Sequence, residues 1–179
     1  MTSKRYIALL RGINVGRAKR VAMADLRQLV EDIGHGEVRS VLNSGNIVFS
    51  AADIDPLAAA TAIEEALVLK LGVTARVMVI GGDTLAAVLA ENSLLPLATD
   101  HARLLVFLLP DAGARDALAP LCARDWGEGA LAVGQHAAYV WCPDGVLDSP
   151  AAAALGKQLG DKTTSRNWNT LCKLYALCA

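Results

Sequence analysis

The 179-residue chain is poor in aromatic residues, which make up 4% of it, and it has only three histidines. No apolar run approaches the roughly 20 residues that cross a bilayer, and the first residues enter a strand pattern without the apolar stretch of a secretion signal. The histidines show no HxH or HExxH spacing, so we expect no metal site and no cofactor. These absences predict a cytoplasmic protein without a membrane partner.

Cysteine is also scarce, and its spacing is uninformative for metal or redox chemistry. Cys122, Cys142, Cys172 and Cys178 include no CxxC pair, and they lie within apolar patterns. Reduced, buried thiols are the expected state, which agrees with a cytoplasmic location.

Acidic residues are missing from both ends of the chain. Residues 1–24 hold six bases and no acid, and residues 162–179 hold three bases and no acid, whereas the middle is strongly acidic and the net charge is -1. If the fold brings the two ends together, the result is a focused positive patch on an otherwise acidic protein. Such a patch suits a small anion or a single phosphate group better than indiscriminate duplex binding.

Apolar residues nevertheless make up 54% of the chain, which predicts a folded protein with a core of Leu, Val and Ala. In the first half, apolar spacing and turn residues predict the order β-α-β-β-α-β, with elements at residues 6–10, 23–33, 38–42, 47–49, 56–71 and 73–80. This is the split βαβ pattern of ferredoxin-like domains.

The second half repeats the order and then ends in helix, with a single helix expected from residue 111 to residue 122 and a last helix over 165–177. The chain is therefore predicted to have an α+β fold of two tandem ferredoxin-like βαββαβ-type units, the second ending in helices. The first unit spans 1–91 with a following short helix, 92–102 is a linker, and 103–179 forms the second unit, whose C-terminal helix packs back on the first.

The segment Arg11–Gly16 places one base, two glycines and an asparagine between a strand and a helix. Glycine allows positive φ or close approach of a ligand, and free N–H groups at a helix start favour anions. The spacing fits neither a P-loop nor GxGxxG. A structural turn in which Asn14 bonds its own backbone and Arg11 pairs with an acid is an equal alternative. For the nearby basic run of Arg17, Lys19 and Arg20 a solvated loop is the commoner explanation, and the absence of an interspersed acid supports an anion site as the alternative.

Asn43–Asn46, with the sequence Asn-Ser-Gly-Asn, is turn chemistry between two short strands. It is no nucleophile elbow, because the flanking glycines are missing and a strand follows. A structural turn is the simpler interpretation, and Ser44 as a ligand-binding hydroxyl is the alternative.

The segment Arg166–Thr170 is expected to open the last helix, with Arg166 in its first turn. A base at that position opposes the helix dipole, at a cost of up to about 1 kcal/mol, unless an anion or an acid compensates it. That cost indicates either an anion site or a salt bridge to an acid from the middle of the chain.

The chain resembles the bacterial domain-of-unknown-function family numbered 1697. The resemblance rests on Arg11–Gly16, Met23–Leu26, Asn43–Phe49 and Thr164–Leu171 with Lys173-Leu174, in matching order and spacing over nearly the whole chain. It implies two ferredoxin-like α+β units and an uncharacterised function, so it supplies no catalytic residues.

We expect a binding module for a small anionic or phosphate-bearing molecule at the junction of the two units, with nucleic acid as the weaker variant of that ligand. The expected ligand-binding residues are Arg11, Gly12, Asn14, Gly16, Arg17, Lys19, Asn43, Ser44, Gly45, Asn46, Arg166, Asn167, Trp168, Asn169 and Lys173. One alternative is a structural or protein-interaction protein whose polar motifs lock the units together. Another is an enzyme acting on an anionic substrate, for which the sequence offers no general base.

Overall fold

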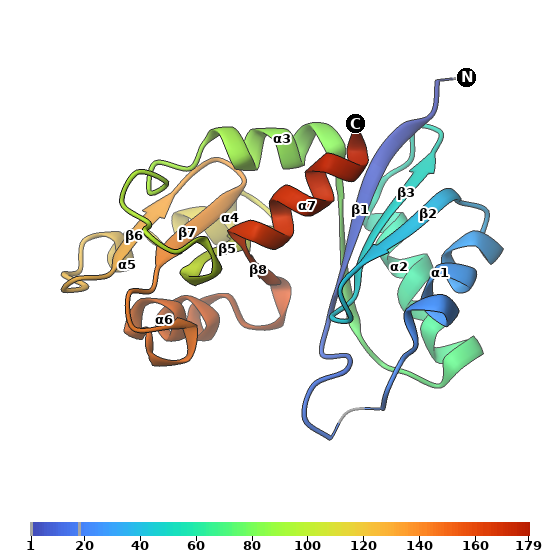
Figure 1. Cartoon of the computed structure of the whole chain (residues 1–179), viewed down its shortest axis with the longest axis horizontal. Helices are drawn as coiled ribbons and strands as arrows, with labels where there is room; N and C mark the ends of the chain where they lie inside the picture. The colour runs from blue at the N-terminus through green and yellow to red at the C-terminus, as the bar shows by residue number, and fades with distance from the viewer. Residues whose placement is uncertain (1, 18) are drawn as a thin grey trace. The chain divides into compact units, whose positions relative to one another are not determined.

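The protein is described by a computed structural model that covers residues 2–17 and 19–179, and it divides into two compact units. Unit 1 comprises the chain up to Leu85 together with Lys173–Ala179, and unit 2 comprises Ala86–Cys172. Each unit combines helices with one four-stranded antiparallel sheet (Figure 1). In the described part of the chain, no helix is long and apolar enough to cross a membrane.

Unit 1 follows the predicted order of elements. They are β1 (Lys4–Arg11), α1 (Met23–Asp32), β2 (Gly36–Val41), β3 (Asn46–Ala51), α2 (Pro56–Ala66), a π-helical turn η1 (Leu67–Leu71), β4 (Arg76–Gly81) and α3 (Gly82–Ala90), which continues into unit 2. The strand order is β2-β3-β1-β4, and β1 pairs antiparallel with both β3 and β4. Helices α1 and α2 lie on the same face of this sheet (Figure 1).

The core of unit 1 forms where the apolar positions of β1 meet those of the helices. Tyr6, Ala8 and Leu10 alternate along β1 and pack in one buried cluster with Leu26 and Leu29 of α1. Strand side chains alternate between faces with a period of two, whereas helical neighbours recur every three to four residues, and both periods are visible in this cluster. The sequence pattern therefore specifies which face of each element enters the core.

Helix α2 begins where the sequence predicts. The carboxylate of Asp55 accepts hydrogen bonds from the N–H groups of Leu57 and Ala58, both at 3.3 Å, and Pro56 occupies the first turn. The helix continues through η1 and ends at Gly72, whose φ of 63° is the left-handed conformation typical of a helix end. Both predicted ends of this helix are confirmed.

Unit 2 has the same strand arrangement. Its strands are β5 (Leu104–Leu108), β6 (Ala130–Val133), β7 (Ala137–Trp141) and β8 (Ser165–Asn167). Its helices are α4 (Ala112–Asp116), α5 (Ala119–Cys122) and α6 (Pro150–Leu159). The 3-10 turns are η2 (His101–Arg103), η3 (Val146–Asp148) and η4 (Gly160–Lys162). The order β6-β7-β5-β8 again places the first strand of the unit between the third and the fourth. The last helix, α7 (Trp168–Cys178), continues into unit 1.

The prediction that the second unit goes directly into helix without a final strand is wrong. Ser165–Asn167 forms β8, in which Arg166 lies opposite Val106 of β5, and α7 starts only at Trp168. Three residues are too few to show an alternating pattern, and the hydroxyl-rich Thr163–Ser165 resembles a helix cap in sequence.

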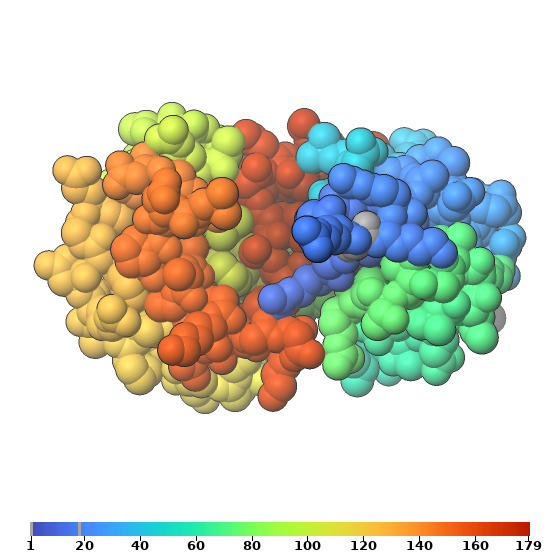
Figure 2. Space-filling model, turned by 90° about the horizontal axis from the view of Figure 1, so that it is seen from below, coloured from blue at the N-terminus to red at the C-terminus, as the bar shows by residue number. Residues whose placement is uncertain are grey.

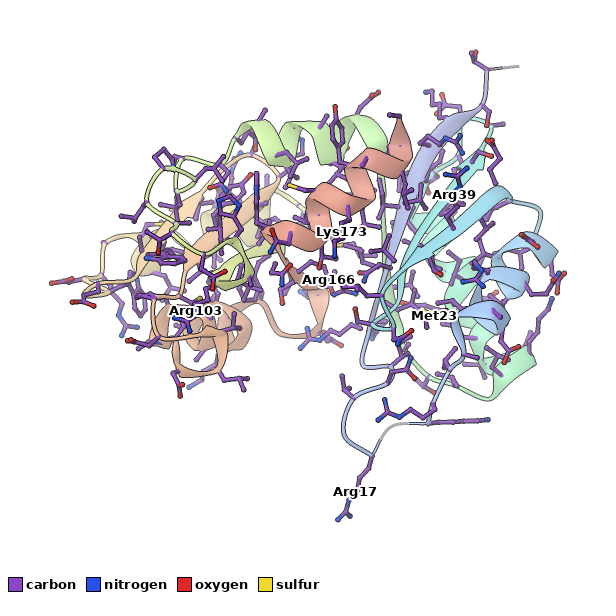
Figure 3. All side chains as sticks on the ribbon, in the orientation of Figure 1. Arg17, Met23, Arg39, Arg103, Arg166 and Lys173 are labelled. Atoms are coloured by element: carbon purple, nitrogen blue, oxygen red, sulfur yellow. The ribbon has the colours of Figure 1, made fainter. Side chains whose placement is uncertain are left out.

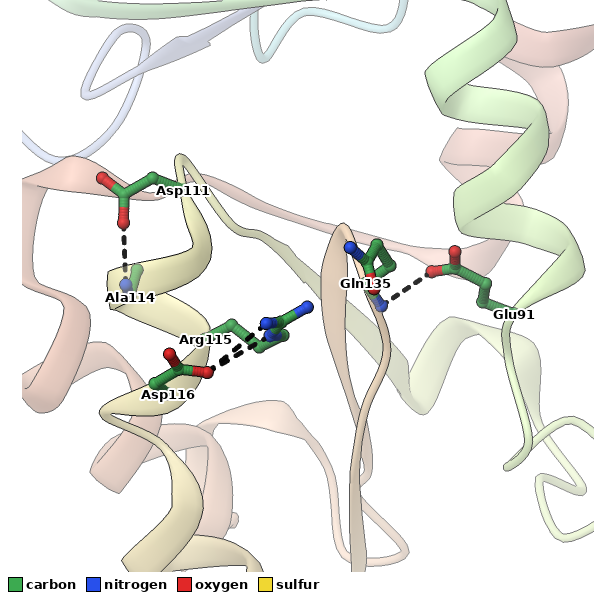
Figure 4. Close-up of polar contacts among 6 residues, drawn as sticks. All are labelled: Glu91, Asp111, Ala114, Arg115, Asp116 and Gln135. Carbon is green, nitrogen blue, oxygen red and sulfur yellow. Dashed lines mark hydrogen bonds and ion pairs between the residues drawn. The ribbon is translucent and has the colours of Figure 1, made fainter.

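The single helix predicted up to Cys122 is also corrected, because it is two short helices. Asp111 caps α4 by accepting a 2.7 Å hydrogen bond from the N–H of Ala114 (Figure 4), and α4 ends at Asp116. Pro120 then lies in the first turn of α5. A proline has no N–H to donate to the carbonyl four residues earlier, here that of Asp116, so the two helices cannot be continuous.

The turn between β6 and β7 is held by a residue from outside the hairpin. The carboxylate of Glu91 accepts a hydrogen bond from the N–H of Gln135 at 3.0 Å (Figure 4). The same oxygen accepts a second hydrogen bond from the N–H of His136 at 3.4 Å. The other carboxylate oxygen lies 3.2 Å from Nδ1 of His136. The residue that directly follows α3 thereby fixes this hairpin, although 44 residues separate Glu91 from Gln135.

All four cysteines are free thiols, but the prediction that they are buried holds only for Cys142. Cys122 and Cys172 are exposed. In α7 the buried face is set by Leu171 and Leu174, at 1% and 0% exposure, and Cys172 lies about 100° around the helix from Leu171. Its side chain therefore faces outward.

Candidate functional site

The loop that follows β1 contains three alternate residues whose backbone lies at positive φ. Gly12, Asn14 and Gly16 have φ values of 85°, 54° and 53°. Among the described residues, no atom comes within 4 Å of a Cβ built on either glycine, so both glycines serve the turn and not a close contact. The loop projects beyond the end of the unit 1 sheet (Figure 1), and its dark-blue segment lies at the surface in Figure 2.

The side chain of Asn14 fastens this loop to two neighbouring segments. Its Nδ2 donates to the carbonyl of Val21 at 3.0 Å and to the carbonyl of Asn43 at 2.7 Å. Its Oδ1 accepts a 2.7 Å hydrogen bond from the N–H of Val21. Asn14 is therefore a structural residue that joins the loop after β1 to the turn between β2 and β3.

The Asn43–Asn46 turn packs against the end of β1 and the loop that follows it. Gly45 has a φ of 86°, and a Cβ on it would lie 2.7 Å from Cβ of Leu10 and 3.0 Å from Cδ1 of Ile13. The fully buried Asn46 donates from Nδ2 to the carbonyl of Val41, at 2.9 Å, and to Oγ of Ser44, at 3.0 Å. Only the outer half of the turn, Asn43 and Ser44, is exposed.

An open depression of about 600 Å³ lies where these two segments meet the start of α1. We call it the loop depression, and its lining residues are Asn14, Arg20, Val21, Ala22, Met23, Leu42, Asn43 and Ser44. Three of the predicted site residues, Asn14, Asn43 and Ser44, thus share one surface. Gly45 and Asn46 lie behind that surface and support it.

The start of α1 gives the loop depression its electrostatic character. The residue at the N-cap is Ala22, and no described side chain caps this helix end. The acidic residue of the first turn is Asp25. The first N–H groups of a helix have no partner within the helix and carry partial positive charge. Arg20 adds a full charge at the rim, where its Nη1 donates to the carbonyl of Asn14 at 2.7 Å.

The other basic residues of this region lie outside the loop depression and differ in their surroundings. Arg17 is exposed at the loop tip, and its side chain points away from unit 1 (Figure 3). Nζ of Lys19 donates to the carbonyl of Leu71 at 2.6 Å, at the end of the π-helical turn, where a cation complements the helix dipole. Arg11 is the last residue of β1 and lies opposite Arg76 of β4.

In unit 2, Arg166 lies in β8 and not in the first turn of a helix, so the expected cost of opposing a helix dipole does not apply. Its Nη1 donates to Oγ1 of Thr164 and to the carbonyl of Ser165, both at 2.8 Å. Burial lowers the pKa of the Arg166 guanidinium to about 10. The unusual feature of this residue is its desolvation, which the sequence pattern did not reveal.

The rest of the closing motif builds the start of α7. Oδ1 of Asn167 accepts hydrogen bonds from the N–H of Thr170, at 2.9 Å, and from its Oγ1, at 3.0 Å, as a helix-capping side chain does. Trp168 is 7% exposed and belongs to the interior. Asn169 is exposed in unit 2, and Lys173 is exposed in the part of α7 that belongs to unit 1.

Sequence reasoning missed the apolar and backbone part of the loop depression. Leu42 is 55% exposed with a φ of 60°, and no turn rule assigns a leucine to that conformation. The one available signal was at Ala22, because the helix at Met23 starts without a preceding Ser, Thr, Asp or Asn. Within residues 2–17 and 19–179, no three His, Cys, Asp or Glu side chains are grouped so that they could hold a metal ion.

Comparison with known proteins identifies relatives without assigning an activity. No curated protein matches the chain. The structure is similar to that of the conserved bacterial protein SP0830 from Streptococcus pneumoniae, with a TM-score of 0.74, 21% sequence identity, and coverage of 99% of this chain and 100% of the other. At that identity the likeness shows a shared fold. Residues 3–139 match the sequence profile of the family described as Protein of unknown function (DUF1697), and the chain therefore belongs to that family.

Proposed function

We propose that the protein is a binding module for a small anionic or phosphate-bearing molecule, which it takes up in the loop depression of unit 1. The observation that carries the proposal is the start of α1, which no described side chain caps and which lies in this depression together with Arg20, Asn43 and Ser44. Phosphate groups bind at such helix starts because several N–H donors and the helix dipole converge there.

The charge of the surrounding segment supports an anion over a cation. Residues 1–24 contain six bases and no acid, and Asp25 is the first acidic residue after them. Arg20 reaches the rim through its bond to the carbonyl of Asn14, which leaves further guanidinium N–H groups for a ligand. Asn14 itself contributes rigidity, since its amide is used by Val21 and Asn43.

The test is a thermal-unfolding series with inorganic phosphate and with adenosine monophosphate, at constant ionic strength. A ligand that binds the folded protein raises Tm with its concentration. We expect Arg20→Gln to weaken the apparent affinity about fivefold, as the loss of about 1 kcal/mol from one exposed ionic contact would do. Arg39→Gln is the matched control, because Arg39 is an exposed arginine of the same unit on β2 (Figure 3), away from the depression.

Equal losses in the Arg20→Gln and Arg39→Gln proteins would overturn the assignment to the loop depression. No rise of Tm with either phosphate compound would remove the proposal altogether. Binding of single-stranded oligonucleotides, with a steep decrease at higher salt, would instead identify the nucleic acid variant of the ligand.

A protein-interaction function is the second candidate, and it rests on a different observation. Val15 and Leu42 are 57% and 55% exposed, and Leu42 lines the depression in a strained left-handed conformation. Contiguous exposed apolar patches mark protein-interaction sites, and Val15 and Leu42 contribute large exposed apolar side chains to the loop and the adjoining turn. Under this alternative, Leu42→Asn relieves the strain and abolishes binding of the partner.

Two finer assignments accompany the proposal. We infer that both units are ferredoxin-like, which is supported by the shared strand arrangement in which the first strand pairs antiparallel with the third and the fourth. A cytoplasmic location is inferred from the cysteine pattern, since cysteine residues without a disulfide framework are typical of reducing compartments.

A further inference from the structure

A second cavity, of about 310 Å³, lies entirely within unit 2. Its walls come from the segment before β6, the end of β7, the loop that follows β7, and the start of α6. We call it the tryptophan cavity, and the lining residues that matter for its chemistry are Trp126, Glu128, Trp141, Asp144, Asp148 and Ser149. None of these residues belongs to the loop depression.

The walls of the tryptophan cavity are fixed by backbone contacts. A Cβ on Gly129 would lie 3.1 Å from the carbonyl oxygen of Trp141, so the segment before β6 lies tightly against the end of β7. Nη1 of Arg103 donates to the carbonyl of Pro143 at 2.6 Å and holds the next loop. On the last wall, Oγ of Ser149 accepts the N–H of Ala152 at 3.1 Å and caps α6. The cavity is therefore preformed.

The charge of the lining has one sign. Glu128, Asp144 and Asp148 are exposed carboxylates at its edge, and no lysine, arginine or histidine is among the residues that line it. Opposing positive charge comes from the start of α6, where the Ser149 cap already uses one N–H group, and from Arg103 and Arg124, which contact Pro143 and Trp126 from outside the lining. Three carboxylates without a neighbouring base in the lining favour a positively charged ligand.

The aromatic lining indicates what kind of cation fits. Two of the three tryptophans of the chain line this cavity. The guanidinium carbon of Arg124 lies 4.3 Å from the ring centroid of Trp126, so a cation already occupies one approach to this indole within the fold. The ring is held in place by its Nε1, which donates to the carbonyl of Leu121 at 2.9 Å. Indole faces attract weakly hydrated organic cations through their quadrupole.

A metal ion does not fit this lining, because in the described chain no three carboxylate, thiol or imidazole groups come together as ligands. The cavity volume lies at the small end of the range for small-molecule sites, about 300–1,000 Å³. We propose that the tryptophan cavity binds a small organic cation, specifically an alkylated ammonium group, with Trp126 and Trp141 as the aromatic walls and the three carboxylates as the counter-charge.

The experiment titrates the full-length protein with choline and, separately, with 3,3-dimethylbutan-1-ol, which has the same shape but carries no charge. Intrinsic tryptophan fluorescence and calorimetry report binding. We expect saturable binding of choline, at least about fivefold tighter than that of the neutral alcohol, as a cation–π contribution of about 1 kcal/mol requires. Trp126→Leu should weaken choline binding about fivefold, and Asp148→Asn about threefold.

Asp116→Asn is the matched control for charge, because Asp116 is an exposed acid of unit 2 outside the cavity that pairs with Arg115 (Figure 4). Unchanged choline affinity in this variant supports the assignment. Should Trp126→Leu fail to fold, the contrast between Asp148→Asn and Asp116→Asn decides alone. The proposal is overturned by absence of choline binding, by equal affinity for the neutral alcohol, or by an equal loss in Asp116→Asn and Asp148→Asn.

Discussion

Two separate constraints apply to Gly45. Its φ of 86° lies in the left-handed region, and a Cβ would approach Cβ of Leu10 to 2.7 Å. We expect Gly45→Ala to lower the free energy of unfolding by about 2–4 kcal/mol, from about 1–2 kcal/mol of backbone strain and a further cost of overpacking. Chemical denaturation followed by circular dichroism measures this loss.

Gly12 provides the control for that measurement. Its φ of 85° matches that of Gly45, but no atom of the described residues lies within 4 Å of a Cβ built on it. Gly12→Ala should therefore cost only the backbone term, about 1–2 kcal/mol. If the two variants were equally destabilised, the close approach of Gly45 to Leu10 and Ile13 would contribute nothing to the free energy of unfolding.

His35 makes the stability of unit 1 depend on pH. Its ring stacks on Phe49 with centroids 4.4 Å apart, and burial lowers the pKa of this imidazole below its ordinary value of 6.5. The unfolded chain then binds the proton more readily than the folded chain does. Stability is therefore fully present above pH 6.5 and decreases as the pH falls from 6.5 toward the folded-state pKa, below which it no longer changes.

The measurement compares urea unfolding at pH 7.5 and pH 5.5 in the natural protein, in His35→Phe and in His101→Gln. We expect His35→Phe to lose part of the decrease in stability between these two pH values, since the neutral phenyl ring keeps the stack without titrating. His101 is exposed and serves as the control. An unchanged pH dependence in His35→Phe would show that other groups account for it.

At the scale of elements, the sequence predicts those features that depend on contacts between residues only a few positions apart. In Asp55-Pro56 and Ser149-Pro150 a capping residue precedes a proline, which is a local pattern that favours a helix start, and both caps are present at the starts of α2 and α6. Such signals are reliable because donor and acceptor lie within one turn, where no tertiary contact is needed to bring them together.

Elements that depend on partners far away in the sequence were not predicted, because no local pattern encodes such a contact. β8 has three residues, and its pairing with β5 brings together positions about sixty apart in sequence. Glu91 holds the β6–β7 turn across 44 residues, and nothing in its local sequence indicates a carboxylate that accepts backbone N–H groups. The sequence predicted only part of the lining of the loop depression. Its polar turn residues are recognisable in the sequence, whereas Ala22 and Leu42 come next to them only in the folded chain.

At the scale of the whole molecule, the division into units does not follow the order of the chain. The last residues, Lys173–Ala179, belong to unit 1, although Ala86–Cys172 between them and the rest of that unit form unit 2. All three tryptophans, at 126, 141 and 168, lie in unit 2. Tryptophan fluorescence therefore follows unit 2, whereas far-ultraviolet circular dichroism follows the backbone of both units.

This distribution allows the role of the carboxyl-terminal segment to be measured. Leu174 is 0% exposed, so Leu174→Ala should lower the free energy of unfolding by about 2–5 kcal/mol. Because Leu174 belongs to unit 1, we expect the dichroism transition to shift to lower denaturant before the fluorescence transition does. Tyr175→Ala, at a neighbouring position that is 46% exposed, should change stability by less than about 0.5 kcal/mol. Coincident shifts of both signals in Leu174→Ala would instead mean that the two units unfold as one cooperative body.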